Sequence, residues 1–376
     1  MIVNEVVNIT YDYQVFALQA YGGVSRYFYE LCSRLELQTG GAMQSNILAP
    51  LHINNYIKNL PSRQLKTMAQ VKAFRGSWLA MQPFNQAASI LKNRFKTPNL
   101  LHETYYAKQT TAPKNCPIVL TVYDMVHELF EHTLKTSDST TMRKRLAVDR
   151  ADHIICISES TKQDLMRLFG TDEKKISVIH LGFSINGGAI ANKIKLTALH
   201  RKPFILHVGS RAGYKNFAAL LQAYAASAQL RKDFDLISFG STSFSADEMM
   251  MLQKLGIQDN VHFASGNDQQ LAQYYQTATI FVYPSLYEGF GIPPLEAMHF
   301  GCPVACSNTS SMPEVVGNAA KLFDPKRVES MRVGMEQMLT LTDVREKQIK
   351  LGHERLKMFS WDKCTLETAH VYKKLL

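Results

Sequence analysis

The chain has 376 residues, of which 46% are hydrophobic, and its formal net charge is +10. This length predicts two domains, and the hydrophobic fraction is that of a globular protein with substantial cores. The sequence has no stretch of about 18 uncharged apolar residues, so no transmembrane helix is expected. The positive charge favours an anionic partner: phosphate groups, nucleic acid or an acidic membrane surface.

The N-terminus and the cysteines bear on the cellular location of the protein. The first residues, Met1 to Glu5, lack the basic start and the apolar run of a signal peptide. The six cysteines form no CxxC pair and are expected to be reduced thiols. Both features predict a cytoplasmic protein.

The first half of the chain predicts alternating strands and helices. Residues 2–10 are expected to form a strand, residues 11–21 a loop, and residues 24–37 a helix after the pair Gly22-Gly23. This order is that of half a nucleotide-binding unit, but GxGxxG is absent, and a plain turn is the alternative. Further strands are expected at 46–50, 98–101, 117–123, 153–157 and 175–181, and further helices at 140–150 and from Lys162, with the N-cap near Ser158.

A basic region lies inside this half. From Leu37 to His102 the sequence contains no Asp or Glu. Residues 62–96 are expected to be helical in pieces, because apolar residues recur there every three or four positions. One interpretation is a solvated amphipathic helix packed on its domain. The other is a helix that lies on an anionic membrane surface or holds an acceptor's phosphates, with Lys66, Lys72, Arg75 and Trp78 as candidate contacts.

The second half also alternates between strands and helices. Residues 182–202 are predicted to be a linker between the domains. Strands are then expected at 204–208, 234–239, 261–264, 279–283 and 303–306, and helices at 217–229, 246–255 and 268–276. Such alternation implies a parallel, doubly wound sheet of the α/β class.

The stretch from Tyr283 to Ala297, YPSLYEGFGIPPLEA, predicts a ligand site. A short buried strand leads into the loop Glu288-Gly289-Phe290-Gly291, and Pro293-Pro294 opens a helix whose N-terminus favours anions. Glu288 and Glu296 are strong acceptors that suit the hydroxyl groups of a sugar or ribose. A glycosidase pair is the alternative, which a parallel-sheet loop beside a basic loop disfavours.

Two further loops carry charged residues. Arg211 and Lys215 follow the first strand of the second half, and a guanidinium fork with an ammonium group suits a diphosphate. Asp124 and His127 follow the strand at 117–123, where a general base or a sugar ligand is expected. A solvated basic loop and a structural histidine are the respective alternatives. Neither HExxH nor an Asp-x-Asp after a strand occurs, so no metal or other cofactor is expected.

These motifs resemble the family 4 glycosyltransferases of the GT-B type over almost the whole chain. The resemblance rests on Gly22-Gly23 with SRYFYEL, and on TVYDMVHE, ISESTKQDL, VGSRAGYKN, VHFASGNDQQLAQYYQTA, YPSLYEGFGIPPLEAM, SMPEVVGNAA and FSWDKCTLETAHVY. The YGGVSRYFYEL opening is similar to bacterial mannosyltransferases that build O-antigen or related polysaccharides from GDP-mannose.

The resemblance implies two facing Rossmann-like domains. The first, residues 1–185, would bind the acceptor, the second, residues 200–360, would bind the nucleotide sugar, and a C-terminal helix at 361–376 would pack back on the first. It also implies a transfer without metal and with retention at the anomeric carbon.

The family's donor site maps onto this sequence residue by residue. Arg211 and Lys215, with Ser210 beside them, would bind the diphosphate, and Gly22 and Gly23 would let the first loop approach it. The transferred sugar would lie at Glu288, Gly289, Phe290 and Gly291, a phosphate near Leu295, the ribose at Glu296, and the base near Gly266 and Asn267. Many relatives have His-Asp where this chain has Tyr123-Asp124, so Asp124 and then His127 are the candidate catalytic residues beside Glu288.

The predicted function is transfer of α-mannose from GDP-mannose to a lipid-linked or polysaccharide acceptor, by a protein that is peripheral at the cytoplasmic face of the membrane. A UDP-hexose donor and a sugar-nucleotide 2-epimerase are the alternatives. A nucleic-acid-binding protein has only the charge in its favour, because no nucleic-acid motif is present, and no nucleic-acid partner is expected.

Overall fold

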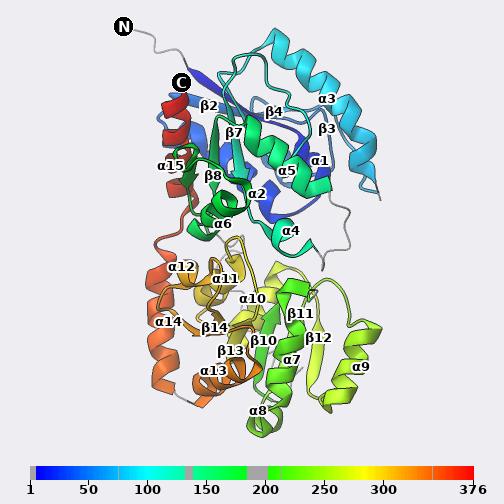
Figure 1. Cartoon of the computed structure of the whole chain (residues 1–376), viewed down its shortest axis with the longest axis vertical. Helices are drawn as coiled ribbons and strands as arrows, with labels where there is room; N and C mark the ends of the chain where they lie inside the picture. The colour runs from blue at the N-terminus through cyan, green and yellow to red at the C-terminus, as the bar shows by residue number, and fades with distance from the viewer. Residues whose placement is uncertain (1–5, 75, 132–138, 184–201, 212, 341) are drawn as a thin grey trace. The chain divides into compact units, whose positions relative to one another are not determined.

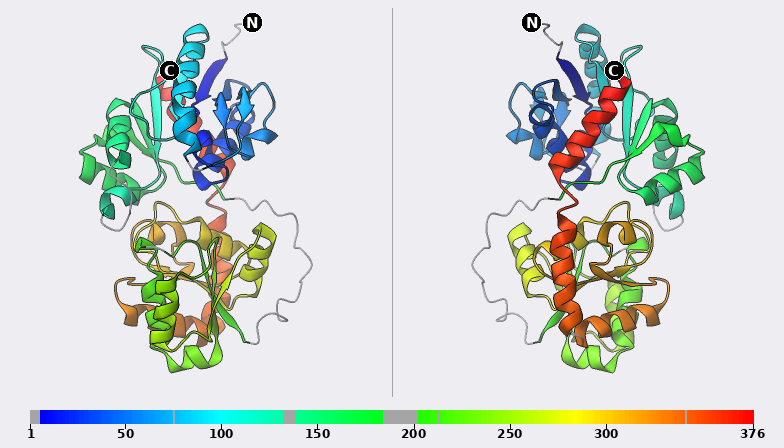
Figure 2. Two further views of the ribbon diagram at one scale, coloured as in Figure 1. Left: turned by 90° about the vertical axis from the view of Figure 1, so that its right-hand side faces the viewer. Right: turned by 90° about the vertical axis from the view of Figure 1, so that its left-hand side faces the viewer.

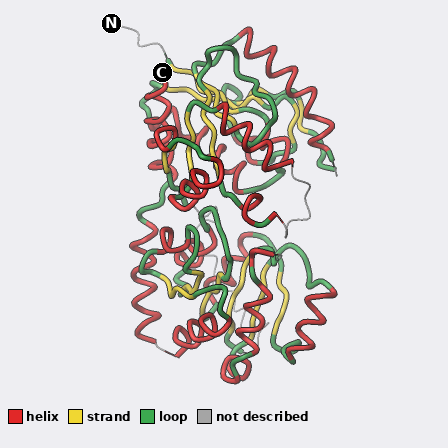
Figure 3. The backbone as a smooth tube through the Cα atoms, viewed as in Figure 1, coloured by secondary structure: helices red, strands yellow, loops and turns green. Residues whose placement is uncertain are grey.

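We describe a computed structural model of the chain, which covers residues 6–74, 76–131, 139–183, 202–211, 213–340 and 342–376 (Figure 1). The chain divides into two compact units. Of the described residues, 6–131, 139–182 and 360–376 form the N-terminal unit, and those from 183 to 359 form the C-terminal unit. Both units alternate between strands and helices along the chain (Figure 3).

The N-terminal unit is built on a parallel sheet of seven strands in the order β4-β2-β1-β6-β7-β8-β9. Its central strands are short and are buried along their whole length, as expected for a sheet covered on both faces. The strands are β1 (Val7–Tyr11), β2 (Met43–Leu48), β4 (Leu65–Lys66), β6 (Leu100–Glu103), β7 (Ile118–Val122), β8 (His153–Cys156) and β9 (Ile176–Val178); β3 (Leu51–His52) and β5 (Ala69–Gln70) form a separate pair.

Seven α-helices of the described chain belong to this unit. They are α1 (Gln14–Leu18), α2 (Gly23–Gln38), α3 (Ser77–Phe95), α4 (Val126–Leu129), α5 (Ser139–Arg150), α6 (Glu159–Phe169) and α15 (Trp361–Leu375). The N-cap predicted at Ser158 is confirmed, because its side chain accepts a hydrogen bond from the backbone N–H of Thr161.

The last helix, α15, is part of the N-terminal unit although it follows the whole C-terminal unit in sequence (Figure 2). It packs against α2. The hydroxyl of Tyr372 lies 2.6 Å from Nδ1 of His102 on β6 and 3.4 Å from the hydroxyl of Tyr11 on β1. These buried contacts explain why the C-terminal residues fold with the N-terminal sheet.

The C-terminal unit has a parallel sheet of six strands in the order β12-β11-β10-β13-β14-β15. The strands are β10 (Phe204–Val208), β11 (Asp235–Phe239), β12 (Val261–Ala264), β13 (Ile280–Tyr283), β14 (Val304–Ser307) and β15 (Ala320–Phe323). The helices are α7 (Phe217–Ala225), α8 (Ala228–Asp233), α9 (Ala246–Leu255), α10 (Asp268–Thr277), α11 (Ile292–His299), α12 (Met312–Val316), α13 (Val328–Thr340) and α14 (Thr342–Leu356).

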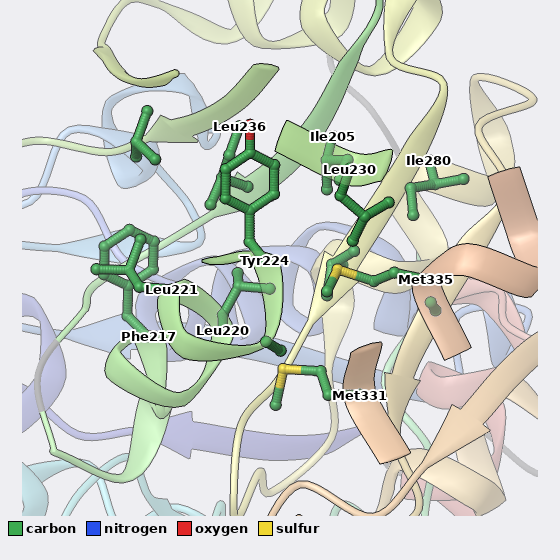
Figure 4. Packing of buried hydrophobic residues seen from close by; sticks show 14 of the residues in the cluster. Ile205, Phe217, Leu220, Leu221, Tyr224, Leu230, Leu236, Ile280, Met331 and Met335 are labelled. Carbon is green, nitrogen blue, oxygen red and sulfur yellow. The ribbon is translucent and has the colours of Figure 1, made fainter. Parts of the chain in front are cut away.

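Helix packing on this sheet forms the core of the C-terminal unit (Figure 4). Phe217 and Tyr224 of α7, with Met331 and Met335 of α13, pack in one cluster with buried strand residues such as Ile205. The cluster holds the helices against the sheet whose strands β10 and β13 lead into the loops described below. Burial of one such large apolar side chain stabilises a fold by about 1.5–3 kcal/mol.

Four sequence expectations are wrong in detail. The expected loop at 11–21 contains α1, because Val15, Phe16 and Ala17 are buried together. Residues 62–74 are not helical: β4 and β5 pair there with β2 and β3. The expected helix at 217–229 is two helices, because Ser227 caps α8. The first strand begins at Val7, so Val6 is not part of it, and residues 2–5 of the expected strand lie outside the described residues. Residues 184–201 of the expected linker, and Arg75, lie outside the described residues.

Candidate functional site

The strand order of the C-terminal unit places two predicted site loops side by side. From β10 the chain proceeds to β11 and β12 on one side of the sheet, whereas β13, β14 and β15 follow on the other side. Ligands of open α/β sheets bind outside the carboxyl ends of the strands at such a switch point. Lys215 follows β10 and Glu288 follows β13, and these two strands are hydrogen-bonded neighbours.

Lys215 and Glu288 form an ion pair at this point. The Lys215 ammonium lies 2.7 Å from a carboxylate oxygen of Glu288, and both side chains are largely buried. The ammonium also lies 5.1 Å from the ring centre of Tyr214 and 5.8 Å from that of Tyr283. The sequence predicted both residues as donor ligands, and the structure brings them together.

Two serines that the sequence analysis missed hold the Glu288 loop. The backbone N–H of Glu288 donates to Oγ of Ser310, and the hydroxyl of Ser311 donates to the carbonyls of Glu288 and Phe290 at 2.8 and 2.7 Å. Ser310 has a positive φ of 51°, which is uncommon outside glycine and marks a constrained turn. The pair Ser310-Ser311 before Met312 was the available sequence signal.

The glycine at the start of α11 is required by its surroundings. Gly291 has φ of 107°, and a Cβ built on it would lie 2.1 Å from Cε of Met312. Phe290 is buried with its ring 5.6 Å from that of Phe359, so it contributes packing and its backbone rather than an exposed ring. Leu295 is fully buried, which leaves only its backbone for a phosphate, and Gly289 is partly buried.

Arg211 has a carboxylate partner that the sequence did not reveal. Its Nε lies 2.7 Å from Glu248 of α9, and its Nη2 donates to the carbonyl of Ser243 at 2.8 Å. The guanidinium carbon also lies 5.0 Å from the ring centre of Phe244. Arg211 is therefore held toward α9, while Ser210 beside it is exposed.

The predicted ribose and base ligands lie on the neighbouring helices. Glu296, on α11, accepts a hydrogen bond of 3.1 Å from the hydroxyl of Tyr275 on α10. Asn267 caps α10 in a reciprocal capping box with Gln270. Gly266 is exposed, and a Cβ there would lie 2.4 Å from the Gln270 amide oxygen, so the glycine serves this cap.

In the N-terminal unit, Asp124 and His127 follow β7 and belong to a charged cluster. The Lys144 ammonium lies 2.6 Å from Glu128 and donates to the backbone carbonyl of Asp124 at 2.9 Å. Neither Lys144, which is completely buried, nor Glu128 was predicted. Oδ1 of Asp124 accepts from the N–H of Val126 at 3.1 Å. Burial, followed by the Lys144 charge, lowers the pKa of His127, so its imidazole is neutral at pH 7.

The two glycines at the start of α2 differ in their surroundings. Gly22 is the N-cap residue, and a Cβ there would lie 2.2 Å from the side-chain oxygen of Gln19. A Cβ on Gly23 would meet no atom within 4 Å. A side chain at position 22 would displace the amide end of Gln19, whereas one at position 23 would meet no atom of the described chain. The predicted role of both glycines in approaching a diphosphate stays a prediction.

A pocket of about 420 Å³ lies at the switch point of the N-terminal sheet. That sheet reverses between β1 and β6, and the pocket is lined by residues after each of these strands, including Tyr13, Gln14 and Tyr105. Buried Asp12 ties the two loops, because it accepts hydrogen bonds from the N–H and hydroxyl of Thr104 at 2.9 and 2.6 Å. Trp78 of α3 and Arg143 of α5 complete the wall.

The described residues contain no group of three or more His, Cys, Asp or Glu side chains that would hold a metal ion. None of their helices is long and apolar enough to span a bilayer. All six cysteines are buried and unpaired.

Comparison with known families agrees with this geometry. The family model for glycosyl transferases group 1 matches residues 190–355, and that for glycosyltransferase family 4 matches residues 21–186. The chain therefore belongs to the family 4 glycosyltransferases, and its two Rossmann-like units have the GT-B fold.

Individual relatives place it more closely. The chain is 33% identical to O-antigen chain mannosyltransferase B of Escherichia coli over 237 residues, which are 61% of this chain and 62% of that protein. It is 28% identical to an MMP alpha-(1->4)-mannosyltransferase of Mycolicibacterium hassiacum over 62% of this chain and 57% of that protein. The chain thus spans less than two thirds of the length of these relatives.

Solved structures with low identity share the fold. Sucrose-phosphate synthase from Thermosynechococcus elongatus superposes with a TM-score of 0.75 and 19% identity, over 98% of this chain and 99% of that one. Anabaena Alr3699/HepE in complex with UDP and glucose superposes with a TM-score of 0.72 and 17% identity, over 96% of this chain and 98% of that one.

Proposed function

We propose that the protein is a retaining glycosyltransferase that moves α-mannose from GDP-mannose onto a lipid-linked or polysaccharide acceptor in the synthesis of a cell-surface glycan. The observation that carries this proposal is the Lys215–Glu288 pair at the switch point of the C-terminal sheet. Relatives named as mannosyltransferases support mannose as the sugar. The guanosine carrier rests on the sequence resemblance to O-antigen enzymes.

The two basic residues would do the work of a metal ion. Departure of a nucleoside diphosphate requires that its developing charge be neutralised. Lys215 and Arg211 bring two cations to the loop after β10, and each already has a carboxylate neighbour that orients it. We assign the diphosphate to these cations, the transferred sugar's hydroxyls to Glu288 and the ribose to Glu296, with no divalent cation required.

The acceptor would be activated on the same face from which the diphosphate leaves. In this mechanism the leaving phosphate accepts the acceptor's proton, which gives retention without a covalent intermediate. Asp124 and the neutral imidazole of His127 are the residues of the N-terminal unit that we assign to orienting the acceptor hydroxyl.

Helix α3 supports a peripheral association with an anionic membrane surface. It buries a mainly polar stripe: Ser77, Met81, Asn85, Ser89 and Asn93. The polar side is buried for a structural reason, because Asn85 exchanges hydrogen bonds with the backbone of Leu51 at 2.8 and 2.9 Å, and Asn93 donates to the carbonyl of Thr111. The exposed side carries the large apolar residues Leu79, Phe84, Leu91 and Phe95.

Lysines without a carboxylate partner in the described chain lie at the C-terminal end of α3 and next to it. Lys66, Lys72, Lys92 and Lys96 form no ion pair with any residue that the structure describes. Partial burial and the charges of Lys66 and Lys96 lower the pKa of Lys92, which shows that these ammonium groups lie close together. Basic residues beside exposed aromatic and aliphatic side chains suit the interface of an anionic bilayer.

A donor screen with product analysis tests the function. Purified protein is incubated with GDP-mannose or UDP-glucose, and with a lipid-linked acceptor. We expect hydrolysis or transfer with GDP-mannose, an α-linked product, and full activity in the presence of EDTA. Absence of calorimetric binding of both GDP and UDP, with or without a divalent cation, would overturn the proposal.

The same screen separates the alternatives. Turnover of UDP-glucose but not of GDP-mannose would replace the donor within the same class of enzyme. Appearance of an epimerised nucleotide sugar without any acceptor would indicate a 2-epimerase.

A further inference from the structure

The pocket between the loops after β1 and β6 has the composition of a saccharide site. Its wall combines the rings of Tyr13, Trp78 and Tyr105 with polar groups that have no hydrogen-bond partner among the described residues, namely the amide of Gln82 and the hydroxyl of Tyr105. Apolar walls with a few convergent polar groups are typical of small-molecule sites, and about 420 Å³ is within their usual range. The C–H faces of a pyranose stack on aromatic rings, and its hydroxyls need such polar partners.

Arg143 adds an unneutralised positive charge to this wall. Its guanidinium carbon lies 5.2 Å from the ring centre of Trp78. Its Nε is buried and has no hydrogen-bond partner, and no carboxylate of the described chain pairs with it. The pocket lining contains no Asp or Glu. A buried donor without a partner is costly, and a guanidinium fork matches the oxygens of a phosphate.

The two basic residues that follow Arg143 in sequence already have hydrogen-bond or ion-pair partners within the protein, whereas Arg143 has none among the described residues. Lys144 is paired with Glu128, and Arg145 donates to the carbonyl of Leu168 at 3.2 Å and lies over the ring of Phe169. Of the three consecutive basic residues Arg143, Lys144 and Arg145, only Arg143 lines the pocket.

Trp78 connects the pocket with the proposed membrane surface. It lies in the first turn of α3, the helix whose exposed side carries Phe84, Leu91 and Phe95. A glycan bound beside Trp78 would therefore lie next to the proposed membrane-binding surface, in which the lipid carrier of the glycan is anchored. In a lipid-linked glycan, the sugar nearest the membrane is the one that bears phosphate.

We propose that this pocket binds a glycosyl phosphate, with the sugar ring against Trp78 and the phosphate on Arg143. This inference rests on the proposed transferase function and deepens it: the acceptor would be recognised at its phosphate-bearing, lipid-proximal sugar rather than at a neutral chain end.

Intrinsic fluorescence provides a direct test, because the chain has only two tryptophans and the other, Trp361, is buried. The full chain is saturated with GDP, so that the donor site is filled, and is titrated with a hexose 1-phosphate, the free hexose and inorganic phosphate. We expect the hexose 1-phosphate to change Trp78 emission and to bind at least about tenfold more tightly than either fragment, because charge-assisted hydrogen bonds add to ring stacking.

The matched variants are Arg143→Gln and Arg145→Gln on the same helix. Arg143→Gln should weaken hexose 1-phosphate binding by about tenfold or more and raise the KM for a lipid-linked acceptor, while Arg145→Gln should leave both unchanged. The same assay with Trp78→Phe should lose the emission change.

Two outcomes would overturn the inference. One is an equal affinity for free hexose and hexose 1-phosphate, which indicates a neutral-sugar site. The other is an Arg143→Gln protein with unchanged binding. Because binding is read without turnover, these results are separate from failure of the donor screen, which concerns the proposed function itself.

Discussion

At the scale of single residues, charge pairing organises the loops to which we assign the donor. Lys215 and Arg211 were predicted as bare cations, but each is held by a carboxylate, Glu288 or Glu248. Holding the side chains in this way reduces the entropy that ligand binding must remove, because a long basic side chain carries about 2 kcal/mol of rotamer entropy. The pairs therefore pre-organise the loops for an anion.

Removal of either member of the Lys215–Glu288 pair should abolish transfer without unfolding the protein. Lys215→Ala removes the cation that we assign to the diphosphate. Glu288→Ala removes the carboxylate that we assign to the sugar's hydroxyls, and it leaves the Lys215 ammonium without its partner. We expect each to lower the transfer rate by about 100-fold or more, on the scale measured for loss of one transition-state contact.

Initial rates with GDP-mannose, together with melting curves by circular dichroism, check this prediction. Lys232→Ala, on the exposed basic end of α8, is the matched control and should retain full activity. Retained activity in the Lys215 or Glu288 variant would show that the site is assigned to the wrong residues.

At the scale of elements, α3 shows how local pattern and burial can disagree. Its apolar residues predicted a helix packed on the domain or lying on a membrane, and the sequence alone left both open. The structure buries its serines and asparagines and exposes Phe84, Leu91 and Phe95. An exposed apolar face of this kind marks an interaction surface.

Charge reversal on α3 should release the protein from anionic membranes. The double variant Lys92→Glu/Lys96→Glu should bind vesicles of phosphatidylcholine with phosphatidylglycerol at least about tenfold more weakly, since each basic residue near such a surface contributes about 1 kcal/mol. Flotation of vesicles with bound protein measures the effect.

The control is Lys254→Glu/Lys347→Glu, which reverses two exposed lysines on α9 and α14 of the other unit. It should bind like the unaltered protein. Equal binding of the unaltered protein to neutral and anionic vesicles would contradict a membrane role for α3.

At the scale of the whole molecule, each unit has a histidine buried in its sheet. His102 of β6 contacts Tyr372 and Thr121, and His207 of β10 lies 3.2 Å from the hydroxyl of Ser238. Burial lowers the pKa of each imidazole to about 3. Both units therefore fold around a neutral histidine.

Stability should fall as the pH is lowered from about 6.5 toward 3. In this window the unfolded chain, with histidine pKa near 6.5, binds protons that the folded chain does not, so acid favours unfolding. Each histidine should cost about 1–2 kcal/mol at pH 5 relative to pH 7.

Melting temperatures at pH 7, 6 and 5 check this effect. His102→Gln should reduce the pH dependence of the transition of the N-terminal unit, and His207→Gln that of the C-terminal unit. Identical pH slopes in the unaltered protein and both variants would contradict it.

The local sequence anticipated much of the fold and selected Lys215 and Glu288, which the structure brings together. Strands β10 and β12 and helix α9 have the expected bounds, because short apolar runs and cap residues such as Ser245 act within a few positions. The Glu288 loop and its glycines were recognised for the same reason. The helical prediction was wrong over residues 62–74, because pairing of β4 with β2 outweighed the local helical periodicity.

The sequence by itself determined the alternation of strands and helices, the family, and the residues that end β10 and β13. Only the tertiary structure decided which charges meet. It paired Arg211 with Glu248, 37 positions away, and Lys215 with Glu288, 73 positions away. It also assembled Tyr13, Trp78, Tyr105 and Arg143 into one pocket. Local patterns report backbone preference and burial over a few residues, whereas a pocket depends on which strands become neighbours in the sheet.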